Sequence, residues 1–227
     1  MTRLEQPRVS VVIPTMNEEK SIGLVIDELN KAFSGKGSLE ILVVDTNSKD
    51  RTRDIAKEKG AKIVDEPRRG YGRAYKTGFE HAVGEYVATL DADMTYPADM
   101  IPKLVDMLDS QGLDFVTTNR FPEMDKGAMN AKHRLGNWLL STITRILFRI
   151  KVRDSQSGMW VFRRQLLGRL DLVSDGMSFS EEIKIEAFWK AKAAEVPITY
   201  RVRIGEVKLS SWHDGFGNLK FLLKKRF

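Results

Sequence analysis

The 227-residue sequence contains no cysteine. A disulfide framework and a thiolate metal site are therefore both excluded, and any bound metal must be held by oxygen or imidazole ligands. Histidine is also scarce, because only His81, His133 and His213 occur. They are scattered without the spacing of metal ligands, so we assign none of them to catalysis.

The sequence also lacks a hydrophobic run long enough to cross a membrane. Its nearest approach, Leu135–Ile150, contains Arg145 and Arg149 and is shorter than the roughly 20 apolar residues that a helical span needs. Residues 1–8 are polar and lead into no long apolar stretch, so we predict no secretory signal. We therefore expect a cytoplasmic protein that is soluble or peripheral at the cytoplasmic face of a membrane.

Acidic residues are outnumbered, because 37 Lys and Arg face 31 Asp and Glu and leave a net charge of +6. This excess favours anionic partners such as phosphates, acidic lipid surfaces or nucleic acid. No recognised nucleic-acid module is present, so we expect no nucleic-acid partner and keep a basic nucleic-acid-binding protein as the rival interpretation. The 42% apolar content allows a substantial core, and without a Pro/Gly/Ser linker we predict one domain over residues 1–227.

Short apolar runs rich in β-branched residues alternate with helical patterns. The predicted strands are Val9–Ile13, Ile41–Val44, Lys62–Val64, Tyr86–Leu90, Phe115–Thr117, Met159–Phe162 and Ile198–Val202. The predicted helices are Glu19–Phe33, Thr52–Lys59, Gly72–Val83, Asp99–Leu108, Asn130–Ile150, one near Gln165, and Ser178–Ala191. The alternation predicts an α/β fold with a mainly parallel central sheet, helices on both faces, and ligands at the carboxyl ends of the strands.

Two aspartates separated by one residue, Asp91 and Asp93, follow the buried strand at Tyr86–Leu90. Alternation directs both carboxylates to the same side, and the turn at the strand end lets them face a ligand. Mg²⁺ and Mn²⁺ prefer carboxylate oxygens and substrate phosphates. We therefore predict a metal site for a diphosphate here, in preference to a simple helix cap before Pro97.

Polar clusters also follow the first two strands, at Pro14–Glu18 and at Asp45–Asp50. Both lie where a nucleoside binds in a sheet of this kind. Asp45 is a candidate acceptor for a base or ribose hydroxyl, whereas Ser48 and Asp50 are predicted to cap the next helix.

A turn with two glycines, Arg68-Arg69-Gly70-Tyr71-Gly72, precedes the third helix. Its glycines permit close backbone approach to a phosphate or sugar. It is not a dinucleotide fingerprint, because Tyr75 stands where the third glycine is needed and the first strand-to-helix turn lacks the glycines. A dehydrogenase is therefore disfavoured.

These motifs together resemble family 2 glycosyltransferases of the GT-A fold, and within that family the dolichyl-phosphate mannose and glucose synthases. The resemblance continues through the following segments: Asn119-Arg120, Arg134–Asn137, Asp154–Met159, Val196–Ile198 and Arg203–Leu209. It therefore spans nearly the whole chain and implies a nucleotide-sugar-binding half, residues 1–118, and an acceptor-binding half, residues 119–227.

The resemblance implies that one hexose passes with inversion from GDP-mannose, UDP-glucose or UDP-N-acetylglucosamine to dolichyl or polyprenyl phosphate, for protein or surface glycosylation. It implies donor binding by Pro14, Asn17, Glu18, Asp45, Arg69, Gly70, Asp91, Ala92 and Asp93. It implies Mg²⁺ or Mn²⁺ at Asp93 and Asp91, and acceptor phosphate at Arg120, Arg134, Arg203 and Lys208. The expected catalytic residues are Asp91, Asp93, Arg120 and Arg134.

Three positions depart from the family pattern. Thr46 and Arg51 stand where the family commonly has Asp and Gly, and Thr95 stands where mannose synthases have Gln. The donor base and sugar are therefore left open.

The chemistry of a phosphate acceptor is consistent with this resemblance. Its second pKa is about 6, so it is mostly anionic at neutral pH and needs no general base. The alternative is a hydroxyl acceptor on an oligosaccharide, for which Glu181 or Glu182 is the candidate base, although such a pair more often compensates a helix dipole. Arg120 and Arg134 could likewise form ion pairs or lie in solvent instead of binding phosphate, but the surrounding pattern favours phosphate. An inactive sugar-binding regulator is disfavoured by the intact Asp91 and Asp93.

Two segments combine apolar and basic residues as interfacial helices do. One has an apolar face of Leu135, Trp138, Leu139, Ile143, Ile146 and Leu147, and the other is the tail Gly217–Phe227. Burial in a bilayer and attraction to anionic lipid would bring such an enzyme to a lipid substrate. For the first segment we favour ordinary core packing, and for the tail both interpretations stay open.

Overall fold

The computed structural model describes the backbone of residues 6–205 and 211–227, and the side chains of residues 6–205 and 215–227. A seven-stranded sheet forms its centre, in the order β3-β2-β1-β4-β6-β5-β7. The strands are β1 (Val9–Thr15), β2 (Leu39–Asp45), β3 (Lys62–Asp65), β4 (Tyr86–Thr89), β5 (Phe115–Met124), β6 (Trp160–Arg163) and β7 (Ala193–Tyr200). Among these, only β6 runs against its neighbours, so the predicted mainly parallel sheet is confirmed.

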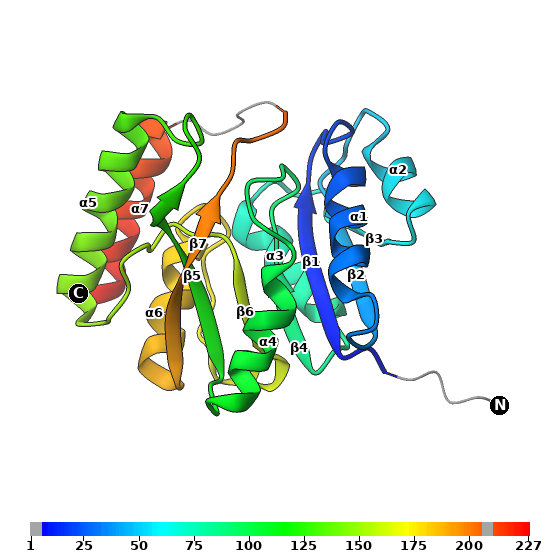
Figure 1. Cartoon of the computed structure of the whole chain (residues 1–227). Helices are drawn as coiled ribbons and strands as arrows, with labels where there is room; N and C mark the ends of the chain where they lie inside the picture. The colour runs from blue at the N-terminus through cyan, green and yellow to red at the C-terminus, as the bar shows by residue number, and fades with distance from the viewer. Residues whose placement is uncertain (1–5, 206–210) are drawn as a thin grey trace.

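Helices cover both faces of the sheet (Figure 1). Their bounds are α1 (Ile22–Phe33), α2 (Thr52–Glu58), α3 (Tyr71–His81), α4 (Met100–Ser110), α5 (Ala131–Phe148), α6 (Phe179–Lys190) and α7 (Ser211–Arg226). Val11 of β1 belongs to the core with α1 and α4, whereas its neighbour Val12 belongs to the core with α3 and α6. This alternation follows from the pleat of the strand, which directs successive side chains to opposite faces.

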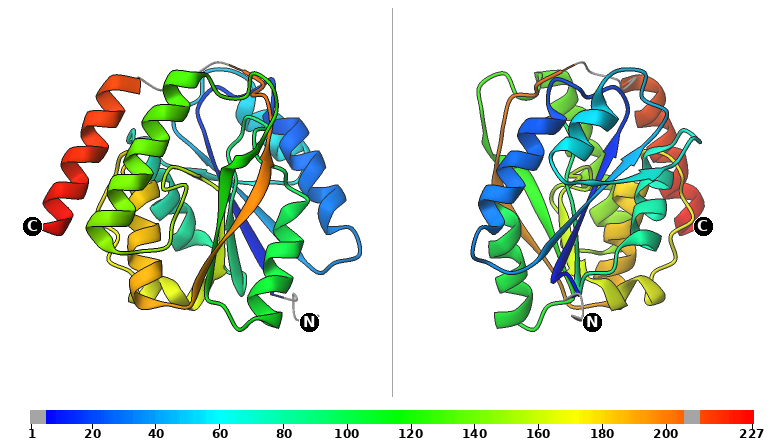
Figure 2. Two further views of the ribbon diagram at one scale, coloured as in Figure 1. Left: turned by 60° about the vertical axis from the view of Figure 1, so that its left-hand side comes forward. Right: turned by 90° about the vertical axis from the view of Figure 1, so that its right-hand side faces the viewer.

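Two helices lie outside the sheet layers, because α5 and α7 run side by side beyond α6 (Figure 1, Figure 2). Phe148 of α5, Ile185 of α6 and Leu222 of α7 share a small third core. Within the part of the chain that is described, no helix is long and apolar enough to span a membrane.

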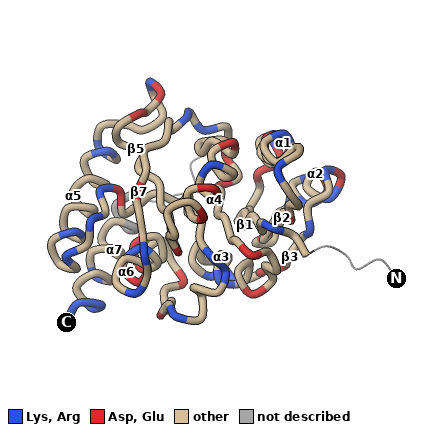
Figure 3. Tube along the Cα trace, turned by 60° about the horizontal axis from the view of Figure 1, so that its bottom comes forward, with Lys and Arg blue, Asp and Glu red and all other residues tan. Residues whose placement is uncertain are grey.

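The outward face of α5 corrects one expectation. Core packing was favoured for this segment, but Leu135, Trp138, Leu139 and Ile146 are 64%, 53%, 50% and 68% exposed. We call these four residues the apolar α5 face. Ile143 and Leu147 do pack against the third core, so the helix buries one side against the protein and presents the other, with basic residues recurring along it (Figure 3).

Strand boundaries differ most from prediction at β5 and β7. β5 continues to Met124, and β7 begins at Ala193, ahead of the predicted Ile198. The two strands pair in parallel from Phe115 with Ala193 onward. Backbone pairing with β5 therefore overrides the low strand propensity of the Ala-Ala-Glu stretch. The predicted short helix near Gln165 is a 3-10 helix over Arg164–Arg169.

The topology brings the functional segments to one edge of the sheet. β1 lies between β2 and β4, and Thr15 at the end of β1 is in register with Asp45 at the end of β2. The Asp91-Ala92-Asp93 turn follows β4 at the same edge. The carboxyl ends of these parallel strands thus meet, as the sequence predicted.

Candidate active site

Asp91 occupies a half-buried position just after β4. Its Oδ1 accepts a hydrogen bond from the Tyr75 hydroxyl at 3.3 Å. Burial, and then the neighbouring charge of Asp93, raise the pKa of Asp91 to about 7, against the opposing charges of Arg203 and Arg120. At neutral pH this carboxyl is therefore poised between its two forms, and a bound cation would favour the ionised one.

Asp93 is held more tightly than Asp91. Its Oδ1 accepts from the Thr95 backbone at 3.1 Å and from the Thr95 hydroxyl at 2.6 Å. Its Oδ2 lies 2.7 Å from Nη2 of Arg203, and its backbone carbonyl accepts from Ile204 at 2.9 Å. The segment around Arg203 is thus fastened to the turn that carries both aspartates.

These two carboxylates can hold a metal only with help from a substrate. Among the described residues there is no group of three or more His, Asp or Glu side chains that could hold a metal ion. Mg²⁺ commonly takes one or two protein carboxylates together with substrate phosphates and water. Asp91 and Asp93 therefore fit a metal whose remaining ligands come from a diphosphate, and such a metal would compete with Arg203 for the Asp93 oxygen.

The loops after β1 and β2 are joined through Asp45, which is buried. Its oxygens accept from the Ser48 hydroxyl at 2.5 Å, from Thr15 Oγ1 at 3.1 Å and from Arg53 Nη1 at 3.1 Å. The carboxylate thus holds the turn, and a further role toward a base or ribose stays a prediction. Ser48 also accepts from the Asn17 backbone at 2.8 Å, so the prediction that it caps the next helix is wrong.

Other predicted donor residues lie in the same two loops. Asn17 Oδ1 accepts from the Lys49 backbone at 2.7 Å, and the Glu18 backbone donates to Thr52 Oγ1 at 2.7 Å. Asp50 accepts from the backbone of Thr52, the first residue of α2, at 3.0 Å, but the N-cap position of α2 is Arg51, so the prediction that Asp50 is the cap residue is wrong by one position. Pro14 lies within β1.

The glycines before α3 make close approaches to protein rather than to open space. A Cβ at Gly70 would lie 2.4 Å from the Asp175 carbonyl oxygen, and one at Gly72 would lie 2.6 Å from that of Ser174. Segment 174–179 occupies the side to which a Cβ would point, and approach of a phosphate or sugar to this backbone stays a prediction. Arg69 is exposed, and its contact with donor stays a prediction.

Arg120 forms a buried ion pair with Asp154. Its Nε and Nη2 donate to the two Asp154 oxygens at 2.7 and 2.9 Å, and its backbone donates to the same carboxylate at 3.0 Å. Both prongs of the guanidinium fork are thus used within the protein. A contact of Arg120 with acceptor phosphate stays a prediction, and the pair leaves a buried positive charge in the field of Asp91.

The remaining predicted acceptor residues are spread over three segments. Arg134 is exposed in the first turn of α5, where Asn130 caps the helix by accepting from the His133 backbone at 2.8 Å. Arg203 pairs with Asp93 as described above. Lys208 lies outside the described residues.

Several residues that shape the site were not predicted. Gly158 abuts Asp91, because a Cβ there would lie 3.3 Å from Asp91 Oδ2 and 2.6 Å from the Tyr71 hydroxyl. The Gly158 backbone donates to the Tyr96 hydroxyl at 2.7 Å. Burial raises the pKa of Tyr71, Tyr75 and Tyr96 well above the ordinary value, so they remain neutral. The Asp154–Met159 motif was a signal for Gly158, whereas the tyrosines were indistinguishable from core residues.

The two candidate bases on α6 are poorly suited to that task. Burial raises the pKa of Glu181 to about 8, so it is mostly protonated at neutral pH. Glu181 accepts from Gln156 Nε2 at 2.6 Å. Glu182 is also buried, accepts from the Ser174 backbone at 2.8 Å and lies 3.4 Å from Nζ of Lys225.

These contacts also make α7 part of the structure rather than a loose tail. Lys225 reaches Glu186 at 2.8 Å as well, and Asn218 donates to Gln156 Oε1 at 3.0 Å. Leu222 is fully buried. Other apolar side chains of the helix point outward, since Phe216, Leu223 and Phe227 are 71%, 46% and 94% exposed. Packing against the protein therefore holds for one side of the helix, and lipid docking by the other side stays a prediction.

Solved structures share this fold. Glucosyl-3-phosphoglycerate synthase from Mycobacterium tuberculosis, in complex with Mn²⁺, UDP-glucose and phosphoglyceric acid, superposes with a TM-score of 0.77 at 24% identity, covering 96% of this chain and 79% of that one. At this identity the likeness bears on the fold alone, which is the GT-A glycosyltransferase fold.

Curated relatives are closer in sequence. The low-salt glycan biosynthesis hexosyltransferase Agl6 of Haloferax volcanii is 38% identical over 96% of this chain, which spans only 53% of that protein. A dolichyl-phosphate hexose transferase of the same organism is 33% identical, with 99% of this chain and 96% of that protein covered. The dolichol-phosphate mannosyltransferase of Pyrococcus furiosus is 31% identical over 89% of this chain and 59% of its own length.

The family assignment rests on a match over most of the sheet and the site. The model of the family described as Glycosyl transferase family 2 matches residues 10–171, a range that runs from the second residue of β1 past the end of β6 and contains both aspartates. The chain therefore belongs to glycosyl transferase family 2.

Proposed function

We propose that this chain transfers one hexose from a nucleotide sugar to a polyprenyl phosphate such as dolichyl phosphate, with inversion and with a divalent metal. The observation that carries the proposal is the Asp91 and Asp93 pair at the carboxyl end of β4, faced by Arg203. Relatives named as dolichyl-phosphate hexose transferase and dolichol-phosphate mannosyltransferase support the choice of acceptor.

In this reaction the acceptor phosphate oxygen forms a bond to the anomeric carbon as the bond from that carbon to the nucleoside diphosphate breaks. No proton has to be removed from the acceptor, because a phosphate monoester is already mostly dianionic at neutral pH. A bound Mg²⁺ or Mn²⁺ would neutralise the charge that develops on the leaving diphosphate.

The protein groups have separate tasks in this proposal. Asp91 and Asp93 hold the metal and donor side. Arg203, fastened to Asp93, places a second positive charge where the diphosphate departs. Exposed Arg134 at the start of α5 offers its guanidinium fork to acceptor phosphate, while Arg120 acts from its buried pair with Asp154 as a fixed charge.

Hydroxyl acceptors are less well served by the α6 carboxylates. A hydroxyl needs a base that is ionised at neutral pH, yet Glu181 has a pKa of about 8 and Glu182 is engaged by Lys225 and the Ser174 backbone. We therefore keep the oligosaccharide acceptor only as an outcome of the test.

We propose that the enzyme works as a peripheral protein at the cytoplasmic face of a membrane. The apolar α5 face and the outward residues Phe216, Leu223 and Phe227 of α7 support this, because these helices lie side by side. Exposed apolar side chains among basic residues are typical of helices that lie in a lipid interface.

The deciding experiment is a screen of radiolabelled GDP-mannose, UDP-glucose and UDP-N-acetylglucosamine with dolichyl or undecaprenyl phosphate in detergent, with and without EDTA. We expect a lipid-linked hexose from one donor and reversible loss with EDTA, and NMR of the product should show the inverted anomer. Transfer only to free oligosaccharides, or full activity in excess EDTA, would contradict the proposal.

A further inference from the structure

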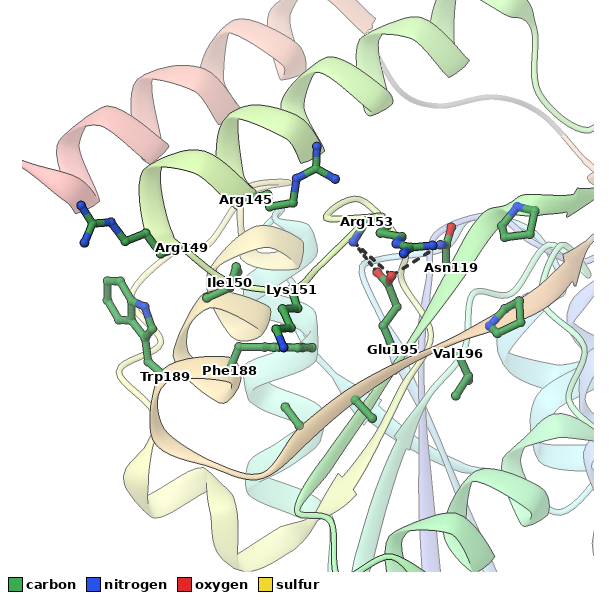
Figure 4. Close-up of a pocket in the computed structure, with 14 residues that line it drawn as sticks. Asn119, Arg145, Arg149, Ile150, Lys151, Arg153, Phe188, Trp189, Glu195 and Val196 are labelled. Atoms are coloured by element: carbon green, nitrogen blue, oxygen red, sulfur yellow. Dashed lines mark hydrogen bonds between the residues drawn. The ribbon is translucent and has the colours of Figure 1, made fainter.

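An open groove of about 1140 Å³ lies between the C-terminal half of α5, the end of α6 and the edge strand β7. Figure 4 shows Arg149 beside Trp189 at one end, Arg153 beside Asn119 and Glu195 at the other, and Lys151 between them. The proposed transfer reaction makes no use of this groove.

Four exposed cations line it, namely Arg145, Arg149, Lys151 and Arg153. Within the described part of the chain, no ion pair joins the side chain of any of the four to an acidic group. Like charges gathered without counter-charges repel each other, so such a cluster favours an anion from outside. Apolar side chains such as Ile150 and Phe188 complete the lining.

The single acid of the lining does not neutralise these cations. Glu195 accepts hydrogen bonds from the backbones of Arg153 at 2.8 Å and Asp154 at 2.9 Å. Burial also raises the pKa of Glu195. Its carboxylate therefore serves the loop between α5 and β6, and the groove keeps a positive potential.

The backbone at Arg149 is a second, independent observation. Arg149 ends α5 in the left-handed conformation with φ of 55°, a position that helices most often give to glycine because a Cβ is disfavoured there. An arginine in this strained position places a guanidinium at the mouth of the groove, and strain of this kind is commonly retained for function.

The groove continues onto the apolar α5 face. Ile146, 68% exposed, adjoins Arg145 in the last turn of α5, and Arg149 ends the helix. Leu139 precedes Ile146 by seven residues, so it lies on the same side of the helix as Ile146. A nucleic acid would gain nothing from these exposed apolar side chains, whereas a bilayer offers acyl chains beside anionic headgroups.

We infer that this groove binds the headgroup of an anionic phospholipid of the bilayer, at a site separate from the sugar-transfer site. The four cations attract the anionic headgroup into the groove, and the apolar α5 face meets the acyl layer beside it. The inference extends the membrane part of the proposed function and depends neither on the sugar nor on the acceptor.

Flotation of the full chain with vesicles tests this site. We expect strong binding to phosphatidylcholine mixed with phosphatidylglycerol and weak binding to phosphatidylcholine alone. Arg145→Gln with Arg149→Gln should bind the mixed vesicles about 25-fold more weakly, from about fivefold per cation near a lipid surface. The matched control, Lys31→Gln with Lys57→Gln on α1 and α2, removes the same charge from exposed positions and should bind like the wild type.

Arg149→Gly separates lipid binding from folding. Relief of the left-handed strain should raise Tm by about 2 °C, while binding to the mixed vesicles falls about fivefold. The inference would be overturned if Arg149→Gly bound the mixed vesicles as well as the wild type, or if the control pair lost as much binding as the Arg145 and Arg149 pair. It would also be overturned if inorganic phosphate or an RNA oligonucleotide, rather than competing lipid, displaced the protein from the vesicles.

Transfer to a short polyprenyl phosphate in detergent keeps the two proposals distinguishable. Wild type and Arg149→Gly should transfer at equal rates there. Lipid-selective binding without any transfer would refute the proposed function and leave the groove assignment intact. Transfer without lipid-selective binding would refute the groove assignment and leave the proposed function intact.

Discussion

Replacing Arg120 by alanine should damage the fold as well as the reaction, because Arg120 and Asp154 are both buried and joined by two short hydrogen bonds. Removal of one partner leaves an uncompensated buried charge, which costs about 3–5 kcal/mol. For a domain of this size each kcal/mol lowers Tm by roughly 2–4 °C, so Tm should fall by about 6–20 °C.

Two further variants give this prediction its controls. Arg120→Leu with Asp154→Leu removes both charges and should recover most of the lost stability, since apolar replacement of a buried pair is often neutral. Arg134→Ala, at an exposed position, should leave Tm unchanged and lower kcat/KM for the lipid phosphate about tenfold to a hundredfold, with donor KM unaffected.

Thermal unfolding followed by circular dichroism measures the changes in Tm, and urea denaturation measures the change in the free energy of unfolding as a shift of the midpoint at constant slope. Steady-state kinetics with each substrate in turn completes the comparison. A wild-type midpoint for Arg120→Ala, together with a selective loss of acceptor affinity, would refute the buried-pair argument and restore Arg120 as a phosphate ligand.

Asp91→Asn and Asp93→Asn should each abolish transfer, and calorimetry should show loss of Mn²⁺ binding in the presence of nucleoside diphosphate. The pKa of Asp91 is raised from 3.8 to about 7, so between these pH values the folded state retains a proton that the unfolded chain releases. The free energy of unfolding of the wild type therefore falls as the pH rises from about 4 to about 7. Asp91→Asn should therefore be the more stable protein at pH 8 by urea denaturation, with the difference vanishing near pH 4. Leu223→Asp with Phe227→Asp should lower transfer to long-chain acceptors in vesicles while sparing a short soluble acceptor, and equal losses on both would indicate structural damage. Glu181→Gln should keep transfer to a lipid phosphate within a few-fold, whereas a loss of about 10²–10⁴ would identify a general base and a hydroxyl acceptor.

The sheet edge that carries the two aspartates could be predicted because local patterns determine it. Apolar runs rich in β-branched residues predict buried strands, and parallel strands bring their carboxyl ends to one edge of the sheet. Asp91, Asp93, Asp45 and Asn17 therefore lie on segments that meet at this edge. The donor base and sugar could not be predicted, because selectivity depends on the shape of a pocket rather than on a motif.

The contacts of residues 119–227 were harder to predict because the contacting residues are distant in the chain. Arg120 pairs with Asp154, 34 residues later, and the approach of Asp175 to Gly70 joins segments still further apart. A motif indicates that an arginine or a glycine has a functional or structural role, but it does not show which residue it contacts in the folded protein. Whether a guanidinium fork is free or occupied is a question of packing.

The sequence by itself determined the α/β alternation, the carboxylate pair after β4 and the amphipathic character of α5, because each depends on residues close together in the chain. Only the tertiary structure decided which side of α5 is covered and which is exposed. Helical periodicity predicts an apolar face but does not show whether that face packs against the protein or is exposed. The same holds for the groove beside β7. Its four cations come from the end of α5 and the loop after it, and they became a site only when the edge strand and α6 closed around them.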